Sequence, residues 1–91
     1  MSAIVRKVLI TNKRGLHARA SAKFVTMASG IGARVEVEKD GATVVGTSIM
    51  GLMMLGAAMG DEITISADGE GAEAAVNSLA ELVEAKFHEA E

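Results

Sequence analysis

Two hydrophobic spacings alternate along the chain. Apolar residues mixed or alternating with charged ones predict strands, whereas apolar residues three and four positions apart predict helices. Strands are expected over residues 4–11, 34–38, 42–45 and 62–67, and helices over 18–29, 49–55 and 71–87. The predicted order is βαββαβα, which favours an α+β two-layer sandwich with the helices layered on one face of a sheet.

Turn and cap residues support these boundaries. Segments 12–15 and 39–41 are polar and contain glycine, as turns do, and the second joins neighbouring strands as a hairpin. Gly30 and Gly32 follow the first helical segment, and Thr47 or Ser48 is a suitable N-cap for the short second helix.

Length and composition restrict the class of protein. Ninety-one residues with no internal repeat or linker predict a single domain over 1–91, and 49% hydrophobic residues are too many for a disordered chain. The chain has no cysteine and only two histidines, His17 and His88, so we expect no disulfide and no metal site.

Residues 41–60 carry no charge over the length of a membrane span. Five glycines and three hydroxyl residues interrupt this stretch, so a buried strand and a short apolar helix are predicted in its place. Arg6 and Lys7 cut short the apolar N-terminus, which excludes a signal peptide. The expected location is the cytoplasm, with no membrane contact.

The net charge of −3 is unevenly distributed. Residues 1–40 hold eight basic and three acidic residues, whereas 41–91 hold one basic and nine acidic residues. Four of the basic residues bracket His17, namely Lys13, Arg14, Arg19 and Lys23. They form either a solvated basic face or a site for an anion or an acidic partner, and charge alone leaves both open.

His17 lies at the predicted start of the first helix. Unpaired amides and a positive potential at that end hold an anion and disfavour a protonated imidazole, which would keep a ring nitrogen nucleophilic. His17 could therefore accept a phosphoryl group, with Arg19 supplying a planar fork of donors. The alternative is an accidental cap or a surface residue. No acidic residue neighbours His17 in sequence, so a triad or general-base role is not indicated.

The remaining histidine, His88, falls near the end of the last predicted helix. A favourable contact with the helix dipole, or no role at all, is the better interpretation for it.

Ser48 is either an ordinary N-cap or a phosphorylation site. A phosphate there would place about two negative charges beside an apolar surface and disturb docking. Apolar residues cover nearly the whole circumference of the short helix, so one side should remain exposed; they are Ile49, Met50, Leu52, Met53, Met54 and Leu55. Methionine-rich surfaces adapt to several partners.

The same sequence features are compatible with two other classes of function. The element order suits a ferredoxin-like RNA-binding domain, but the chain has no Tyr or Trp and both phenylalanines fall in predicted helices, so no nucleic acid is expected. A catalytically silent interaction module that uses the basic helix and the methionine patch stays open.

Two segments resemble one known family. Residues 12–19, NKRGLHAR, resemble the active-site segment of HPr, the histidine-containing phosphocarrier of the phosphoenolpyruvate-dependent phosphotransferase system. Residues 47–56, TSIMGLMMLG, resemble its regulatory-serine segment at the family's spacing, and the likeness extends over essentially the entire chain. The resemblance implies an open-faced sandwich, a four-stranded antiparallel sheet under three helices.

The same resemblance implies a function. Enzyme I, charged from phosphoenolpyruvate, would pass a phosphoryl group to His17 at Nδ1, and His17 would pass it to a IIA protein or domain. Arg19 and the amides near Ala18 would hold the group. The chain would thus be a monomeric carrier with a covalent phosphohistidine, not a free-standing enzyme on a small molecule, and would need no cofactor.

The resemblance also implies regulation and docking. Ser48 would be the target of an ATP-dependent HPr kinase/phosphorylase, and the docking surface would contain Lys23, Ile49, Met50 and Met53. The chain departs from the family at Ala20, where the family commonly has proline. Alanine is the better helix former, so the helix should still begin here. Alanine does not fix φ as proline does, so the His17 loop is expected to be less rigid. Asn12, Lys13 and Ala20 look closest to the nitrogen-related branch, as opposed to a sugar-uptake carrier.

Overall fold

The computed structural model describes residues 3–89, and its elements follow the predicted order. They are β1 (Ile4–Leu9), α1 (Ala18–Ser29), β2 (Arg34–Lys39), β3 (Ala42–Val45), α2 (Ile49–Met54), β4 (Glu62–Asp68), α3 (Ala72–Glu84) and a short 3-10 turn, η1 (Lys86–His88). The predicted βαββαβα order is confirmed, and α1 and β3 have the predicted bounds.

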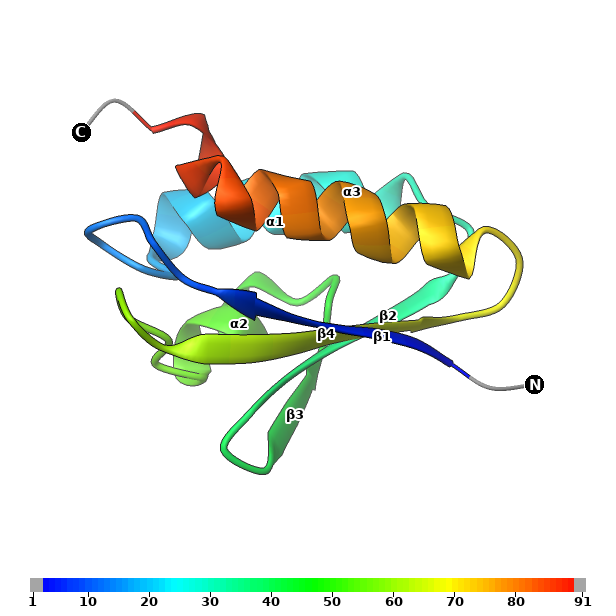
Figure 1. The fold of residues 1–91 in the computed structure, drawn as a ribbon, viewed down its shortest axis with the longest axis horizontal. Helices are drawn as coiled ribbons and strands as arrows, with labels where there is room; N and C mark the ends of the chain where they lie inside the picture. Colours follow the sequence, from blue (N-terminus) through cyan, green and yellow to red (C-terminus); the bar gives the residue numbers. More distant parts are fainter. Residues whose placement is uncertain (1–2, 90–91) are drawn as a thin grey trace.

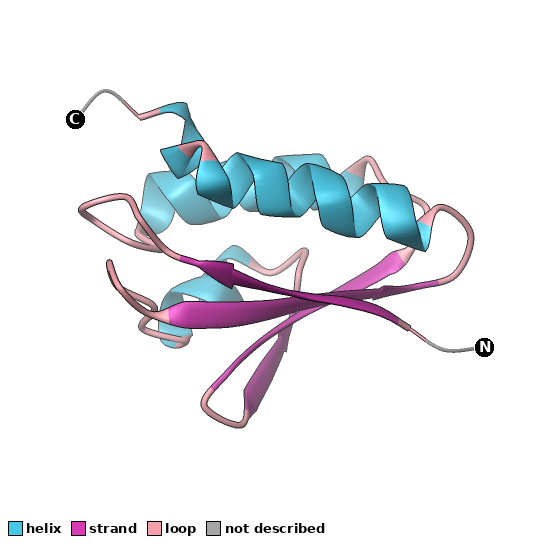
Figure 2. Ribbon diagram, viewed as in Figure 1, coloured by secondary structure: helices cyan, strands magenta, loops and turns pink. Residues whose placement is uncertain are grey.

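The four strands form one antiparallel sheet in the order β1-β4-β2-β3. α1 and α3 lie side by side across one face of this sheet, while α2 packs against α1 and β3 (Figure 1). Figure 2 shows the two long helices, α1 and α3, as a layer on one side of the strands. The predicted α+β sandwich is therefore confirmed.

The core lies between the two layers because alternate strand residues face the helices. In β4 the buried residues are Ile63, Ile65 and Ala67, with exposed or half-buried residues between them. They pack in one cluster with Phe24 of α1 and Leu79 of α3, both of which are fully buried. Each such large side chain contributes roughly 1.5–3 kcal/mol on burial, so the period-two pattern of β4 fixes which face meets the helices.

α2 keeps most of its apolar surface outside the core. Leu52 is fully buried, whereas Met50 is 72% exposed and Met54 is 79% exposed. Ile49 and Met53 are also exposed, so the prediction that one side of this helix stays open is confirmed. Within residues 3–89, no helix has both the length and the apolar character that a membrane crossing requires.

The last helix is shorter than the sequence predicted. A single helix was expected over 71–87, but α3 ends at Glu84, and the backbone turns left-handed at Lys86, Phe87 and His88, where φ is 56–57°. Such φ values are unfavourable for residues other than glycine. Here Phe87 is fully buried and its carbonyl accepts a hydrogen bond from Lys23 Nζ at 2.7 Å. These tertiary contacts stabilise a turn that the helical spacing of apolar residues does not predict.

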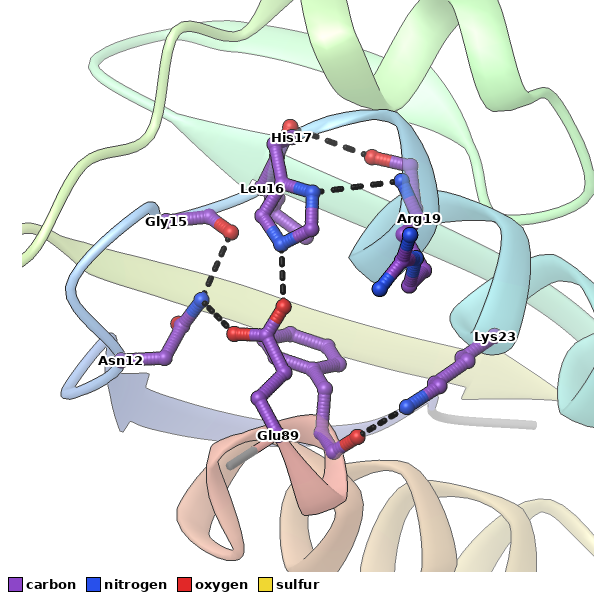
Figure 3. Close-up of polar contacts among 9 residues, drawn as sticks. Asn12, Gly15, Leu16, His17, Arg19, Lys23 and Glu89 are labelled. Carbon is purple, nitrogen blue, oxygen red and sulfur yellow. Dashed lines mark hydrogen bonds and ion pairs between the residues drawn. The ribbon is translucent and has the colours of Figure 1, made fainter. Parts of the chain in front are cut away.

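This turn also changes the place of His88. The residue is exposed in η1, four positions after α3 ends, rather than in the last turn of a long helix. The chain reversal then carries Glu89 back toward the start of α1 (Figure 3).

Candidate functional site

His17 is the N-cap of α1, as predicted. Its backbone is extended (φ −74°, ψ 179°), and its ring atom Nδ1 accepts a hydrogen bond from the Arg19 N–H at 3.3 Å. The His17 carbonyl accepts the first intrahelical bond, from the Ser21 N–H at 2.9 Å. The amides of 18–20 therefore precede the first intrahelical bond, and that of Arg19 bonds to the ring.

The loop that precedes His17 is held against the segment that follows α2. The Leu16 N–H donates to the Ala57 carbonyl at 2.9 Å. Gly15 has a positive φ of 63°, and a Cβ at this position would overlap the Ala57 carbonyl oxygen. The Gly15 carbonyl accepts a bond of 2.9 Å from Asn12 Nδ2. Ala20 is fully buried in the first turn, and the helix begins at Ala18 without a proline.

Glu89 contacts the other side of the imidazole (Figure 3). Its Oε2 pairs with His17 Nε2, and its Oε1 accepts a hydrogen bond from Asn12 Nδ2 at 2.9 Å. The side chains of His17 and Glu89 are only 14% and 13% exposed. No acidic residue neighbours His17 in sequence, but the chain reversal at η1 brings a carboxylate from 72 positions away against its ring.

No local pattern could have identified Glu89. The only signal in the sequence is the uneven charge, with basic residues around His17 and acidic residues in the second half of the chain. That asymmetry favours a contact between the two halves but does not say which carboxylate makes it.

Glu89 is ionised at neutral pH. Burial raises the pKa of Glu89. Hydrogen bonds from His17 and Asn12 and favourable electrostatic interactions with His17 and Lys23 lower the pKa by more than burial raises it, so it lies below its ordinary value. The carboxylate therefore offers two acceptor oxygens, one to the imidazole and one to the Asn12 amide.

Arg19 and Lys23 line a shallow groove along α1, together with Ala22, Thr26 and Met27. Arg19 is exposed, one turn before the half-buried Lys23. The Lys23 ammonium donates to the Phe87 carbonyl, so it fastens the C-terminal turn to α1 as well as lining the groove.

Ser48 caps α2 as predicted. Its Oγ accepts a hydrogen bond from the Gly51 N–H at 2.9 Å. Beside it is the α2 patch, which consists of the exposed side chains of Ile49, Met50, Met53 and Met54. Because the Leu16 N–H bonds to the Ala57 carbonyl, three positions after the last residue of α2, the His17 loop lies next to the C-terminal end of that helix.

The described part of the chain, residues 3–89, shows no cluster of metal-binding side chains and no exposed phenylalanine ring. Among residues 3–89, no group of three or more His, Cys, Asp or Glu side chains is arranged to hold a metal ion. Phe24 and Phe87 are both fully buried, so neither ring is available to stack on a nucleic-acid base.

Comparison with known proteins identifies similar chains over the full length of the fold. The family described as "PTS HPr component phosphorylation site" matches residues 4–85. Phosphocarrier protein NPr of Shewanella violacea is 40% identical over 90 residues, covering 99% of each chain. Phosphocarrier protein HPr of Cupriavidus necator is 41% identical over 86 residues, covering 94% of this chain and 97% of the relative.

Solved structures agree with these relatives. The crystal structure of HPr-C-His from Thermoanaerobacter tengcongensis is 42% identical, covers 100% of both chains and superposes with a TM-score of 0.89. His17, Ala20 and Ser48 all lie within residues 4–85, the range that the family matches.

Proposed function

This chain belongs to the HPr family of phosphocarrier proteins of the phosphotransferase system, and from that premise we propose that it accepts a phosphoryl group on His17 from phospho-enzyme I and passes it to a IIA protein or domain. The observation that carries the proposal is the placement of the His17 ring as the N-cap of α1, with Nδ1 directed at the Arg19 amide.

The transfer step uses the Nδ1 lone pair. This pair attacks phosphorus, the bond from phosphorus to the donor breaks, and the electron pair of that bond stays with the donor. The Arg19 N–H that now bonds to Nδ1 can then donate to a phosphoryl oxygen, together with the Ala18 amide and the Arg19 guanidinium. Positioning and charge stabilisation of this kind are what phosphoryl transfer requires.

The surface around His17 suits large protein partners. Lys23, Ile49, Met50 and Met53 are proposed to contact both enzyme I and the IIA acceptor. The α2 patch supplies an apolar centre, and Arg19 and Lys23 supply a basic border that complements an acidic protein surface.

Ser48 is proposed as a regulatory site for an HPr kinase/phosphorylase. Its hydroxyl is half-buried at the start of α2, next to Ile49 and Met50. A phosphate there would add about two negative charges to the border of the α2 patch, which opposes docking of an acidic partner.

Histidine variants test the carrier function. His17→Ala should abolish acid-labile phosphorylation by enzyme I and phosphoenolpyruvate, because it removes the accepting nitrogen, whereas His88→Ala should label like the wild type. Phosphorus NMR reports the bond type and its site. Labelling of the His17→Ala protein would refute the mechanism, and an unlabelled wild-type protein would favour the silent interaction module.

Three finer expectations belong to the same proposal. The nitrogen-related branch, a cytoplasmic location and a monomeric state stay predictions. NPr and HPr relatives match with nearly equal identity, and some similar solved structures are dimers. Sedimentation of the wild-type chain measures its own state of association.

A further inference from the structure

We propose that Glu89 is a positioning residue for His17: held by Asn12, its carboxylate fixes the ring proton on Nε2 and so leaves the lone pair on Nδ1 for the phosphoryl group. This inference rests on the proposed function, and it names the residue that keeps the His17 Nδ1 lone pair available to the phosphoryl group. It is carried by three side chains that the fold brings together, Asn12, His17 and Glu89 (Figure 3).

The two ring contacts specify one tautomer. An ionised carboxylate can only accept a hydrogen bond, so the nitrogen that pairs with Glu89, Nε2, must carry the proton. A backbone amide can only donate, so the nitrogen that faces the Arg19 N–H, Nδ1, must carry the lone pair. Of the two neutral tautomers, both contacts therefore favour the one that is protonated at Nε2 and nucleophilic at Nδ1.

Asn12 holds the carboxylate in place. Its side chain is fully buried, and Nδ2 donates both to the Gly15 carbonyl and to Glu89 Oε1, each at 2.9 Å. Its Oδ1 is buried without a hydrogen-bond partner among residues 3–89. Reversing the amide would direct Oδ1 at two acceptors, so the orientation is fixed by Gly15 and Glu89 at the cost of one unpaired atom.

The C-terminal turn presents Glu89 to the ring. Phe87 is buried in the core and its carbonyl accepts from Lys23, so the backbone on the N-terminal side of Glu89 is anchored to α1. The carboxylate is thus held by contacts that do not depend on a bound partner. Such preorganisation is the usual means by which a carboxylate orients an imidazole.

The carboxylate serves the reaction in both directions. When the Nδ1–P bond forms, the proton stays on Nε2 and the ring becomes a cation, whose charge the Glu89 carboxylate offsets. When the phosphoryl group moves on, the Nδ1–P bond breaks and its electron pair returns to Nδ1. The ring then leaves as a neutral imidazole, still protonated at Nε2, and no other proton acceptor or donor is needed.

The first measurement uses the free protein and no enzyme I. Nitrogen-15 NMR of the histidine ring, recorded over a series of alkaline pH values, reports the tautomer and the hydrogen bond at Nε2. The wild type should show the Nε2–H form with a downfield, slowly exchanging ring proton. Glu89→Gln keeps the size of the side chain but has one acceptor where two are needed, for Asn12 and for His17. That ring proton should move upfield and exchange faster, and Glu81→Gln, an exposed acid on α3, is the matched control.

The second measurement is the rate of transfer from phospho-enzyme I. Glu89→Gln should slow phosphorylation of His17 by about tenfold, with Glu81→Gln unchanged. Glu89→Asp, which restores a carboxylate on a shorter side chain, should recover part of the rate.

The outcomes separate the two proposals. If the wild type is phosphorylated and Glu89→Gln matches it in ring spectrum and rate, the positioning role is wrong and the carrier function stands. A faster Glu89→Gln protein would show that Glu89 only shields the ring, which also overturns the positioning role. A wild type that takes up no phosphate refutes the carrier function, and this inference with it.

Discussion

Two helices of this domain begin with a side chain that caps the backbone, and the two caps differ in what surrounds them. His17 accepts from the Arg19 N–H at 3.3 Å, and Ser48 accepts from the Gly51 N–H at 2.9 Å. The ring of His17 is covered by a residue from the far end of the chain, Glu89. The hydroxyl of Ser48 is bordered by its own helix and by the exposed α2 patch.

The surroundings of His17 are therefore made by tertiary contacts, whereas those of Ser48 are made by neighbouring residues in the sequence. The surroundings of the His17 ring depend on Asn12, on the turn at Phe87 and on the packing of Gly15 against Ala57. Ser48 depends on residues within three positions of itself. Changes far away in sequence should therefore alter the first helix start and leave the second intact.

The largest expected effect is on the stability of the His17 loop. Gly15→Ala should lower the free energy of unfolding by roughly 2–4 kcal/mol, because its Cβ would overlap the Ala57 carbonyl and lie 2.8 Å from Ala58 Cα, at a φ of +63°. Urea unfolding followed by circular dichroism measures the loss.

Gly56→Ala is the matched control for this substitution. Gly56 has nearly the same φ, +64°, but a Cβ there meets nothing within 4 Å. It should cost only about 1 kcal/mol for the left-handed backbone. Equal losses in the two variants would mean that the contact between the His17 loop and Ala57 contributes nothing.

A smaller effect is expected at the second helix start. Ser48→Asp should slow transfer from enzyme I by about tenfold, equivalent to roughly 1.4 kcal/mol, because it adds a negative charge beside the α2 patch. Stopped transfer reactions with labelled phosphoenolpyruvate give the rate. Ser48→Asn is a comparable N-cap without the charge and should stay within about twofold of the wild type. If both variants slow transfer equally, the charge is not the cause.

The smallest effect is a dependence of stability on pH that only the His17 site should show. Because the pKa of Glu89 is lowered in the folded protein, the fold favours its carboxylate, and this stabilisation is present above the ordinary value of 4.5 and is lost as the pH falls through the folded pKa. The urea midpoint of the wild type should exceed that of Glu89→Gln at pH 7, and the gap should narrow by pH 3. A gap that is constant with pH would contradict the ion pair as its source.

Much of the fold could be predicted because its signals are local. The spacing of apolar residues gave α1 its bounds, and the alternation in β2 and the turn at Asp40 and Gly41 predicted the hairpin. The end of α3 could not be predicted, since the apolar spacing continues to Phe87 while the chain turns away after Glu84. The turn is stabilised by burial of Phe87 and by Lys23, and neither is a property of the segment itself.

The positions of His17 and Ser48 at helix starts could likewise be predicted from the sequence, because capping depends on a residue type and its neighbours within one turn. The tertiary structure alone decided that an acidic side chain would meet the imidazole, that Asn12 would hold it and that Lys23 would fasten the turn that presents it. Contacts of this kind join segments more than sixty residues apart. They depend on how two layers pack, and a one-dimensional pattern of hydrophobic and charged residues does not specify which surface groups that packing brings within bonding distance.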